Sequence, residues 1–225
     1  MGMAPLALYL QGAGIQVEAY DDRFSEPLRS QLISEGIEVL AEPIPGNDPD
    51  CVIRSSAIPE DGSHVAPWIK KGIPIYRRGE FLAKFTSRRK VLAVVGSHGK
   101  TTTTGMLVWA LEQLGFPCSY VVGGSFRDSS LLPGKFLKNS WVILEVDESD
   151  GTIEGFSPRI TLALNCDWDH VDRYESSETL ANAFQSLFER TKEALVIPRG
   201  GGPEQWARRD GLSAGVVTFD PSDKP

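Results

Sequence analysis

A glycine-rich loop holds the residues with the clearest chemistry. The apolar run VLAVV, residues 91–95, is typical of a buried strand, and GSHGKT, residues 96–101, follows it directly. Glycines let backbone N–H groups approach phosphate oxygens, and a helix that begins at such a loop adds partial positive charge. Lys100 can bind the β- and γ-phosphates of a nucleotide, and the Thr101 hydroxyl can bind Mg²⁺. The loop departs from G-x-x-x-x-G-K-[ST] because position 94 is Val, yet its strand–loop–helix context predicts phosphate binding rather than a plain glycine turn.

A second candidate site is the acidic run EVDESD, residues 145–150, at the end of a predicted strand. Ligands of open α/β sheets bind at the carboxyl ends of the strands. A carboxylate there, such as that of Glu145, can hold Mg²⁺ opposite Thr101. The alternative is an acidic corner that is only solvated. The phosphate-binding loop makes the metal hypothesis the stronger of the two.

Three further segments end strands in the same way. In NCDWDHVDRY, residues 165–174, His170 lies among aspartates, which favours a protonated histidine or a nearby metal, although the motif by itself fits a surface histidine in an acidic loop better. Ser55 and Ser56 follow the strand-like CVIR and suit either a sugar–phosphate contact or an ordinary turn. Asp21 occupies a place where an acid often binds a ribose hydroxyl.

Short strand-like runs alternate with helical patterns along the chain, which predicts an α/β fold with a mostly parallel sheet. The strands are expected at residues 17–20, 37–40, 51–54, 73–76, 91–95, 141–146, 160–164, 194–197 and 215–219. The helices are expected from about residue 3, after Ser25, and at 64–71, 101–114 and 179–191. The helix at 101–114 is expected to bury one face, made of Met106, Leu107, Ala110, Leu111 and Leu114. His64 has no partner nearby in the sequence and is expected to lie on the surface.

The polar stretch TSRRK, residues 86–90, predicts a domain boundary. Residues 1–87 then form a Rossmann-like domain, and residues 88–225 form a central α/β domain that contains the phosphate-binding loop. Because a helix pattern begins near residue 3, we expect the first strand of the Rossmann-like domain to be missing.

Composition narrows the function further. The chain has 225 residues, 23 basic and 30 acidic side chains, a net charge of −7 and 41% hydrophobic residues. This is ordinary globular composition, and the acidic balance argues against a general nucleic-acid binder. No apolar run approaches the ~20 residues that cross a bilayer, so no membrane insertion is expected. Three widely separated cysteines fit a reducing cytoplasm.

Four ordered motifs resemble those of the Mur ligases of bacterial peptidoglycan synthesis. GSHGKTTTT is similar to G-T-H-G-K-T-T-T-T, and EVDESD is similar to E-A-D-E-S-D. NCDWDHVDRY is similar to N-x-x-x-D-H-x-D-x-Y, and SSAI with IPIYRRGEFLA is similar to S-S-A-I with I-P-V-x-R-R-A-E-x-L. The start, MGMAPLA, is similar to the end of that family's glycine loop. Taken together, these motif matches favour the alanine-adding branch of the family.

The resemblance implies an ATP-dependent amide ligase that works in the bacterial cytoplasm through an acyl phosphate. The implied substrates are UDP-N-acetylmuramate and an amino acid, with L-alanine favoured, and the implied cofactors are ATP and Mg²⁺. The implied catalytic residues are Lys100, Glu145 and His170, and the metal ligands are Thr101, Glu145 and His170. The implied ATP-binding residues are Gly96, Ser97, His98, Gly99, Lys100, Thr101, Thr102 and Asn165. The UDP-sugar residues are Gly2, Met3, Asp21, Ser55, Ser56 and Arg77.

Three alternatives stay open at the level of sequence. The ligase can belong to a branch that recycles a murein tripeptide, because the amino acid is chosen by a third, C-terminal domain that we expect to be absent here. The chain can also be a non-catalytic nucleotide-binding module, which binds ATP without turnover. An unrelated ATPase switch ranks last, because it leaves the serine and aspartate–histidine motifs unexplained. The sequence does not indicate an oligomeric state.

Overall fold

A seven-stranded sheet forms the centre of the molecule in the computed structural model, which describes residues 2–42, 48–127, 131–147, 153–166, 176–207, 212–220 and 222. Its strand order is β11-β10-β9-β5-β8-β6-β7. Neighbouring strands run parallel except at β6 and β7, which are antiparallel. The strands are β5 (Lys90–Val95), β6 (Ser119–Val121), β7 (Gly134–Lys135), β8 (Trp141–Glu145), β9 (Ile160–Ala163), β10 (Ala194–Pro198) and β11 (Gly215–Phe219). The prediction of an α/β fold with a mostly parallel sheet is confirmed.

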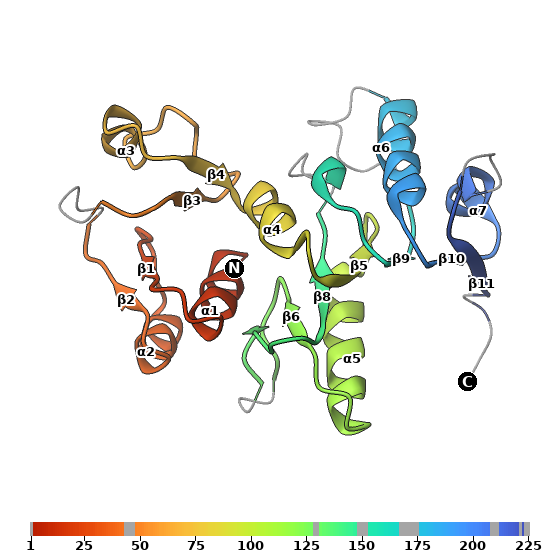
Figure 1. The fold of residues 1–225 in the computed structure, drawn as a ribbon, viewed down its shortest axis with the longest axis horizontal. Coiled ribbons are helices and arrows are strands. Elements are labelled where there is room, and N and C mark those ends of the chain that lie inside the picture. Colours follow the sequence, from red (N-terminus) through yellow and green to blue (C-terminus); the bar gives the residue numbers. More distant parts are fainter. Residues whose placement is uncertain are drawn as a thin grey trace.

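Helices cover the two faces of this sheet unequally (Figure 1). Helix α5 (Lys100–Gln113) packs on one face, where Val108 meets Val94 and Ile143. Helices α6 (Ser177–Arg190) and α7 (Gly201–Ala207) pack on the other face, where Phe184 and Leu187 meet alternate residues of the strands. Such two-sided cover explains why the strands read as continuous apolar runs in the sequence.

The buried face of α5 differs from the one expected. Its buried residues are Lys100, Thr104 and Val108, whereas Met106 is 66% exposed. Leu114, just beyond the helix, is 68% exposed. The expectation that both lie inward was wrong, because the phosphate-binding loop fixes where the helix begins and so sets its rotation over the sheet. Leu107 and Leu111 are partly buried against the core, as expected.

The N-terminal elements form smaller parallel pairs beside the large sheet (Figure 1). Strands β1 (Glu18–Ala19) and β2 (Glu38–Val39) pair with each other, and β3 (Val52–Arg54) pairs with β4 (Ile75–Arg77). The helices of this region are α1 (Met3–Gly12), α2 (Glu26–Ser34), α3 (Ala66–Lys70) and α4 (Arg78–Thr86). The strands stand where the sequence predicted them, although they are shorter. Helix α4 was not predicted, and the polar stretch 86–90 is its end and the start of β5.

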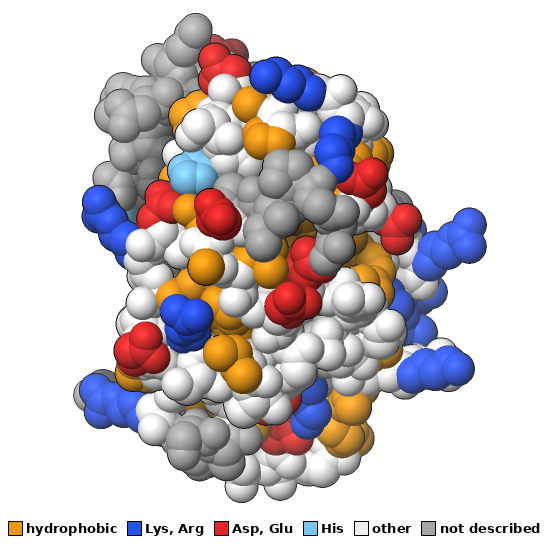
Figure 2. All heavy atoms as spheres, turned by 90° about the vertical axis from the view of Figure 1, so that its left-hand side faces the viewer, with side chains coloured by type: hydrophobic (Ala, Val, Ile, Leu, Met, Phe, Trp, Pro, Cys, Tyr) orange, Lys and Arg blue, Asp and Glu red, His pale blue; other side chains and the backbone are white. Residues whose placement is uncertain are grey.

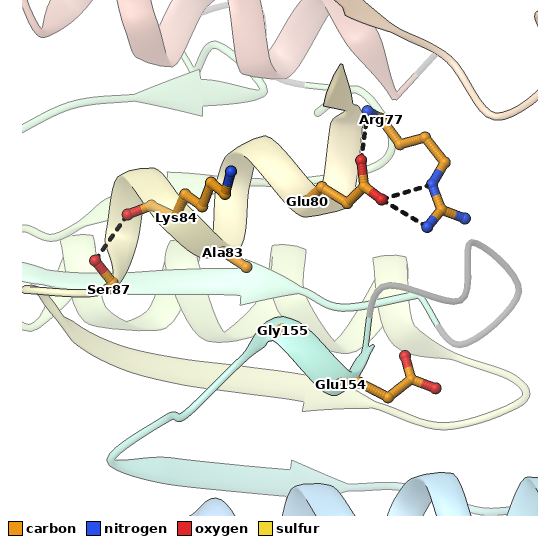
Figure 3. A pocket seen from close by; sticks show the side chains of 7 residues that line it. All are labelled: Arg77, Glu80, Ala83, Lys84, Ser87, Glu154 and Gly155. Carbon is orange, nitrogen blue, oxygen red and sulfur yellow. Dashed lines mark hydrogen bonds and ion pairs between the residues drawn. The ribbon is translucent and has the colours of Figure 1, made fainter. Parts of the chain in front are cut away.

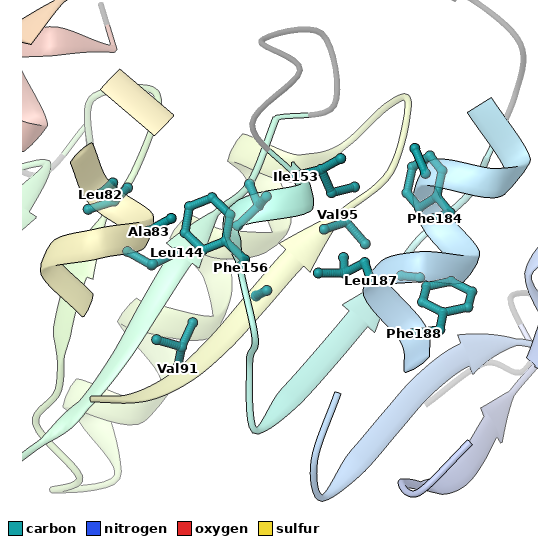
Figure 4. Close-up of a cluster of buried hydrophobic side chains, with 14 of the residues drawn as sticks. Leu82, Ala83, Val91, Val95, Leu144, Ile153, Phe156, Phe184, Leu187 and Phe188 are labelled. Atoms are coloured by element: carbon teal, nitrogen blue, oxygen red, sulfur yellow. The ribbon is translucent and has the colours of Figure 1, made fainter. Parts of the chain in front are cut away.

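One hydrophobic cluster joins these N-terminal helices to the large sheet (Figure 4). Leu6 and Tyr9 of α1 belong to it, as does Leu82 of α4, together with Leu144 of β8 and Phe184 of α6. The 3-10 helix η1 (Ile153–Gly155) packs in the same cluster and contacts α4 and α6. The core therefore includes residues on both sides of residue 87. The domain boundary at that residue stays a prediction.

The described surface includes an exposed apolar strand and a face of mixed charge. Strand β11 is the last strand of the sheet as described, and its Val216 and Val217 are 45% and 54% exposed. On the face built by the N-terminal elements, basic, acidic and apolar side chains are interspersed over the described part (Figure 2). Among the described residues there is no helix long and apolar enough to span a membrane.

Candidate active site

The loop between β5 and α5 has the geometry of a phosphate cradle. Gly96 has φ 145° and Gly99 has φ 82°, both in the region that only glycine enters easily. A Cβ atom at Gly96 would lie 3.0 Å from the Asn165 carbonyl oxygen, so the close approach of the two chains also requires glycine. Helix α5 begins at Lys100, directly after Gly99. The first N–H groups of this helix and its dipole are therefore presented at the loop.

Asn165 ties the loop to the end of β9. The His98 N–H donates to Asn165 Oδ1 at 2.8 Å, and Asn165 Nδ2 donates back to the His98 carbonyl oxygen at 3.0 Å. The two bonds fix the Asn165 amide in one orientation and hold the loop in one shape. From the sequence, Asn165 was predicted to contact the nucleotide. In the structure its side chain binds the backbone of His98 in the loop.

Lys100 lies inside the loop. Lys100 is only 8% exposed, and its Nζ donates to the Gly96 carbonyl oxygen at 2.6 Å. Asp147 Oδ1 lies 3.8 Å from the same nitrogen. A buried ammonium held among loop oxygens is poised to meet phosphate oxygens, and a buried charge is costly unless it is paired in this way. Ser97 is buried in the loop, while Thr102 is exposed in the first turn of α5.

Thr101 and Glu145 meet at the mouth of the loop. The Thr101 hydroxyl donates to Glu145 Oε1 at 2.8 Å, and the Gly123 N–H donates to Glu145 Oε2 at 2.8 Å. A Cβ atom at Gly123 would lie 2.6 Å from Oε2, and one at Gly124 would lie 2.8 Å from Thr101 Cγ2. The pairing of Thr101 with Glu145 was expected from the sequence. Gly123 and Gly124 were missed, although a glycine pair after the apolar run SYVV was a usable signal.

The residues at this mouth suit a hard divalent cation. A threonine hydroxyl and a carboxylate are oxygen ligands of the kind that Mg²⁺ takes beside a nucleotide. Among the described residues no group of three His, Cys, Asp or Glu side chains gathers to hold a metal alone. His170, with Glu148, Asp150, Asp167 and Asp169, lies outside the described residues.

Candidate UDP-sugar residues lie at the start of α1 and after β3. Gly2 is the N-cap of α1 and Met3 is its first residue, and a Cβ atom at Gly2 would lie 3.5 Å from the Arg78 side chain. A guanidinium beside a helix N-terminus suits an anion. Arg78 was missed by the sequence argument, which chose the preceding arginine. Ser55 and Ser56 follow β3, and Ser55 Oγ accepts from the Ala57 N–H at 3.2 Å.

Arg77 pairs with Glu80 at the start of α4. Its side chain donates two hydrogen bonds to Glu80 Oε1, at 3.0 and 2.6 Å, and its N–H donates to Glu80 Oε2 at 3.0 Å. The Arg77 guanidinium therefore holds the pKa of Glu80 below its usual value. Both residues line a hollow of about 480 Å³ between α4 and η1, with Lys84 and Glu154 on its walls (Figure 3). Arg77 is thus the N-cap residue of α4 with its side chain paired to Glu80, and its contact with the UDP-sugar stays a prediction.

The acidic pair after β1 is used within the fold. Asp21 Oδ1 accepts from the Arg23 N–H at 2.8 Å and shapes the turn. Asp22 accepts from the Tyr20 hydroxyl and lies 3.5 Å from His64 Nε2. His64 lies at the surface, as expected, and its partner Asp22 is distant in sequence, because the fold brings the segment before α3 to the end of β1. The ribose role of Asp21 stays a prediction.

Comparison with protein families supports one assignment for both parts of the chain. Residues 1–90 match the family model described as "Mur ligase family, catalytic domain", and residues 94–224 match the "Mur ligase middle domain". Similar curated proteins are the UDP-N-acetylmuramate–L-alanine ligases of Syntrophomonas wolfei, 33% identical over 89% of this chain, and Carboxydothermus hydrogenoformans, 34% identical over 92%. The matches cover 43% and 44% of those relatives, so the chain spans somewhat less than half of their length.

Solved structures show the same fold. A UDP-N-acetylmuramate–alanine ligase of Thermotoga maritima superposes with a TM-score of 0.82 at 26% identity, covering 99% of this chain and 50% of that chain. The UDP-N-acetylmuramate:L-alanyl-gamma-D-glutamyl-meso-diaminopimelate ligase of Neisseria meningitides gives a TM-score of 0.84 at 22% identity, covering 96% and 74%. The second likeness shows the fold alone.

Proposed function

The chain belongs to the Mur ligase family, and from that premise we propose that it carries the UDP-sugar and ATP sites of an amide ligase of peptidoglycan precursor synthesis. The reaction joins L-alanine to UDP-N-acetylmuramate. The γ-phosphoryl group of ATP passes to the substrate carboxylate, and the amine of alanine then attacks the acyl phosphate and expels phosphate. The observation that carries the proposal is the Thr101–Glu145 pair at the mouth of a glycine loop that already encloses Lys100.

In this proposal the loop binds the triphosphate. The N–H groups at the start of α5 and the Lys100 ammonium face the β- and γ-phosphates and neutralise charge as the phosphoryl group moves. Asn165 keeps His98 and its neighbours in the binding shape, so little ordering is left to be done when the nucleotide arrives. The set Gly96, Ser97, His98, Gly99, Lys100, Thr101 and Thr102 supplies the contacts.

Thr101 and Glu145 are the residues of this chain that would hold Mg²⁺. When bound, Mg²⁺ withdraws charge from the transferring phosphoryl group. The Gly123 N–H donates to Oε2 of Glu145, and Oε1 of the same carboxylate accepts from the Thr101 hydroxyl. His170 is proposed as a second metal residue on the resemblance of its motif alone. The same resemblance supports a cytoplasmic location.

The UDP-sugar is proposed to lie at the carboxyl ends of β1 and β3. The N-terminus of α1 and the Arg78 guanidinium form a positive site suited to the diphosphate. Ser55 and Ser56 offer hydroxyl groups at the adjacent strand end, and Asp21 offers a carboxylate to the ribose. Arg77 is kept as a candidate with lower rank, because Glu80 already occupies it.

Two rival functions remain. One rival ligates a murein tripeptide in place of L-alanine, but the relatives above 30% identity are named as alanine ligases. The other rival is a binding module without turnover, which binds ATP at the same loop and forms no amide product.

Phosphate release and amide formation test the proposal directly. The 225-residue chain is incubated with MgATP and UDP-N-acetylmuramate, with L-alanine in one arm and the tripeptide in another. We expect phosphate and amide product only in the L-alanine arm, and ATP binding in calorimetry. Binding without product favours the module, and phosphate release without any UDP-sugar overturns the ligase proposal.

Removing the charge of Lys100 tests the role of the loop, and a lysine outside the loop supplies the matched control. Lys100→Met is expected to raise the ATP dissociation constant by about 10- to 100-fold, because charged hydrogen bonds are worth about 1.5–3 kcal/mol. Lys138→Met removes an exposed lysine outside the loop and is expected to leave ATP binding unchanged.

A further inference from the structure

The carboxylate of Glu145 is held by the end of β6. The Gly123 N–H donates to its Oε2 at 2.8 Å, and neither Gly123 nor Gly124 leaves room for a Cβ atom beside Glu145 and Thr101. A shift of the chain at Gly123 therefore has to move or release the Glu145 carboxylate. The end of β6 is a positioning element for the Thr101–Glu145 pair.

Strand β6 forms a hairpin with β7. Val121 lies opposite Gly134 and Tyr120 lies opposite Lys135, and the Val122 N–H donates to the Pro133 carbonyl oxygen at 2.9 Å. The hydrogen bonds of this hairpin extend to the residue before Gly123. Any displacement of β7 is thus passed to Gly123 through the backbone rather than through flexible side chains.

Helix α1 lies directly on β7, and the two backbones are in contact. A Cβ atom at Gly134 would lie 1.9 Å from the Pro5 carbonyl oxygen, a distance that no side chain tolerates. At the other end of α1, a Cβ atom at Gly12 would lie 3.3 Å from Phe136 Cβ. The Tyr9 ring packs edge-on against Phe136 with 5.4 Å between ring centroids. Helix α1 and the hairpin therefore move together.

The first residue before α1 is Gly2, beside Arg78, where the diphosphate of the UDP-sugar is proposed to bind. We propose that the β6–β7 hairpin couples this end of α1 to Glu145, so that the binding of UDP-sugar and of MgATP is thermodynamically linked. The inference rests on the proposed function. Linkage requires that each ligand change the affinity of the other by the same factor.

Calorimetry with a non-hydrolysable ATP analogue, Mg²⁺ and UDP-N-acetylmuramate measures this factor. In the wild-type chain we expect each ligand to tighten the other by at least about 5-fold. Gly134→Ala forces α1 away from β7 and is expected to reduce the factor to about one, with the affinity for the analogue alone changed by less than about 3-fold. Gly215→Ala is the matched control, because its Cβ atom would meet nothing closer than 3.7 Å.

A second variant guards against misfolding. Phe136→Leu loosens the contact with Tyr9 without adding any atom at the α1–β7 contact, and it is expected to weaken the linkage as well. Hydrogen exchange of residues 119–124 in the wild-type chain gives an independent measurement, and UDP-N-acetylmuramate alone is expected to slow it.

The outcomes separate the two proposals. If the wild-type chain does not bind UDP-N-acetylmuramate, the proposed function fails and the linkage fails with it. If both ligands bind and the factor is one, or if folded Gly134→Ala and Phe136→Leu keep the full factor, the linkage alone is overturned. Unchanged exchange at residues 119–124 when UDP-N-acetylmuramate is bound also overturns it.

Discussion

At the scale of single residues, the groups expected to meet ligand are oriented by hydrogen bonds to their neighbours. Glu145 has both carboxylate oxygens oriented, one by the Thr101 hydroxyl and one by the Gly123 N–H. Asn165 uses its amide to hold His98. The sequence predicts Thr101 and Glu145 because their residue types match metal chemistry. Gly123 was missed, because the glycine pair after SYVV signals a place without room for side chains and does not show which backbone N–H binds Glu145.

Asn165 is expected to act on nucleotide affinity through the loop. Asn165→Ala removes two hydrogen bonds, each worth about 0.5–1.5 kcal/mol, so the ATP dissociation constant is expected to rise about 10-fold. Isothermal calorimetry checks this. Asn182→Ala, on the exposed side of α6, is the matched control and is expected to bind ATP as the wild type does. Equal affinities in the two variants would contradict the role given to Asn165.

Cys118 is expected to resist alkylation in the folded chain. Burial raises the pKa of its thiol to about 11, and Glu112 adds to the effect. At about pH 8 roughly one thiol in a thousand is then a thiolate, and only the thiolate reacts. Mass spectrometry after iodoacetamide treatment is expected to find Cys118 unmodified in the native chain and modified in concentrated urea. Rapid labelling in the native chain would show that the thiol is accessible.

At the scale of elements, short helices and strands depend on caps and neighbours rather than on their own patterns. Helix α4 was missed because RRGEFLAKFT reads as polar, yet the Glu80 carboxylate accepts from the Arg77 N–H at its start and Leu82 belongs to the core. Helix α5 was predicted at nearly its true bounds, while its buried face was not. The N-cap Gly99, with φ 82°, sets that rotation, and periodicity alone does not contain this information.

The α4 cap is expected to give a pH-dependent stability. Hydrogen bonds from Arg77 hold the pKa of Glu80 below its usual value of 4.5, so this stabilisation is complete above that value and is lost as the pH falls through the lowered pKa. Glu80→Gln is therefore expected to lower the urea midpoint at pH near 7, and the difference from wild type is expected to shrink below about pH 4. A difference that is constant with pH would show that charge plays no part.

At the scale of the whole molecule, the alternation of strands and helices was sufficient to predict the parallel sheet. It did not predict how the two parts of the chain share one core. Leu82 of α4 and Phe184 of α6 belong to a single hydrophobic cluster, although they are far apart in sequence (Figure 4). Contacts of this kind join residues that no local pattern relates. The strand order, with β5 between β9 and β8, is likewise a long-range property.

A shared core predicts one cooperative unfolding transition. Leu82→Ala and Phe184→Ala each remove a buried side chain, at a cost of about 2–5 kcal/mol. Both variants are expected to shift the same single transition, with circular dichroism and tryptophan fluorescence coinciding. Two transitions, of which Leu82→Ala moves only one, would show that the N-terminal elements unfold independently.

Strand β11 carries a consequence for handling the protein in concentrated solution. Its backbone is paired with β10 on one side, and Val216 and Val217 remain largely exposed. An apolar strand at the end of a sheet is a template for pairing with strands of other molecules. Gradual self-association on storage is therefore expected to start at this edge, and Val217→Lys is expected to slow it, as light scattering would measure.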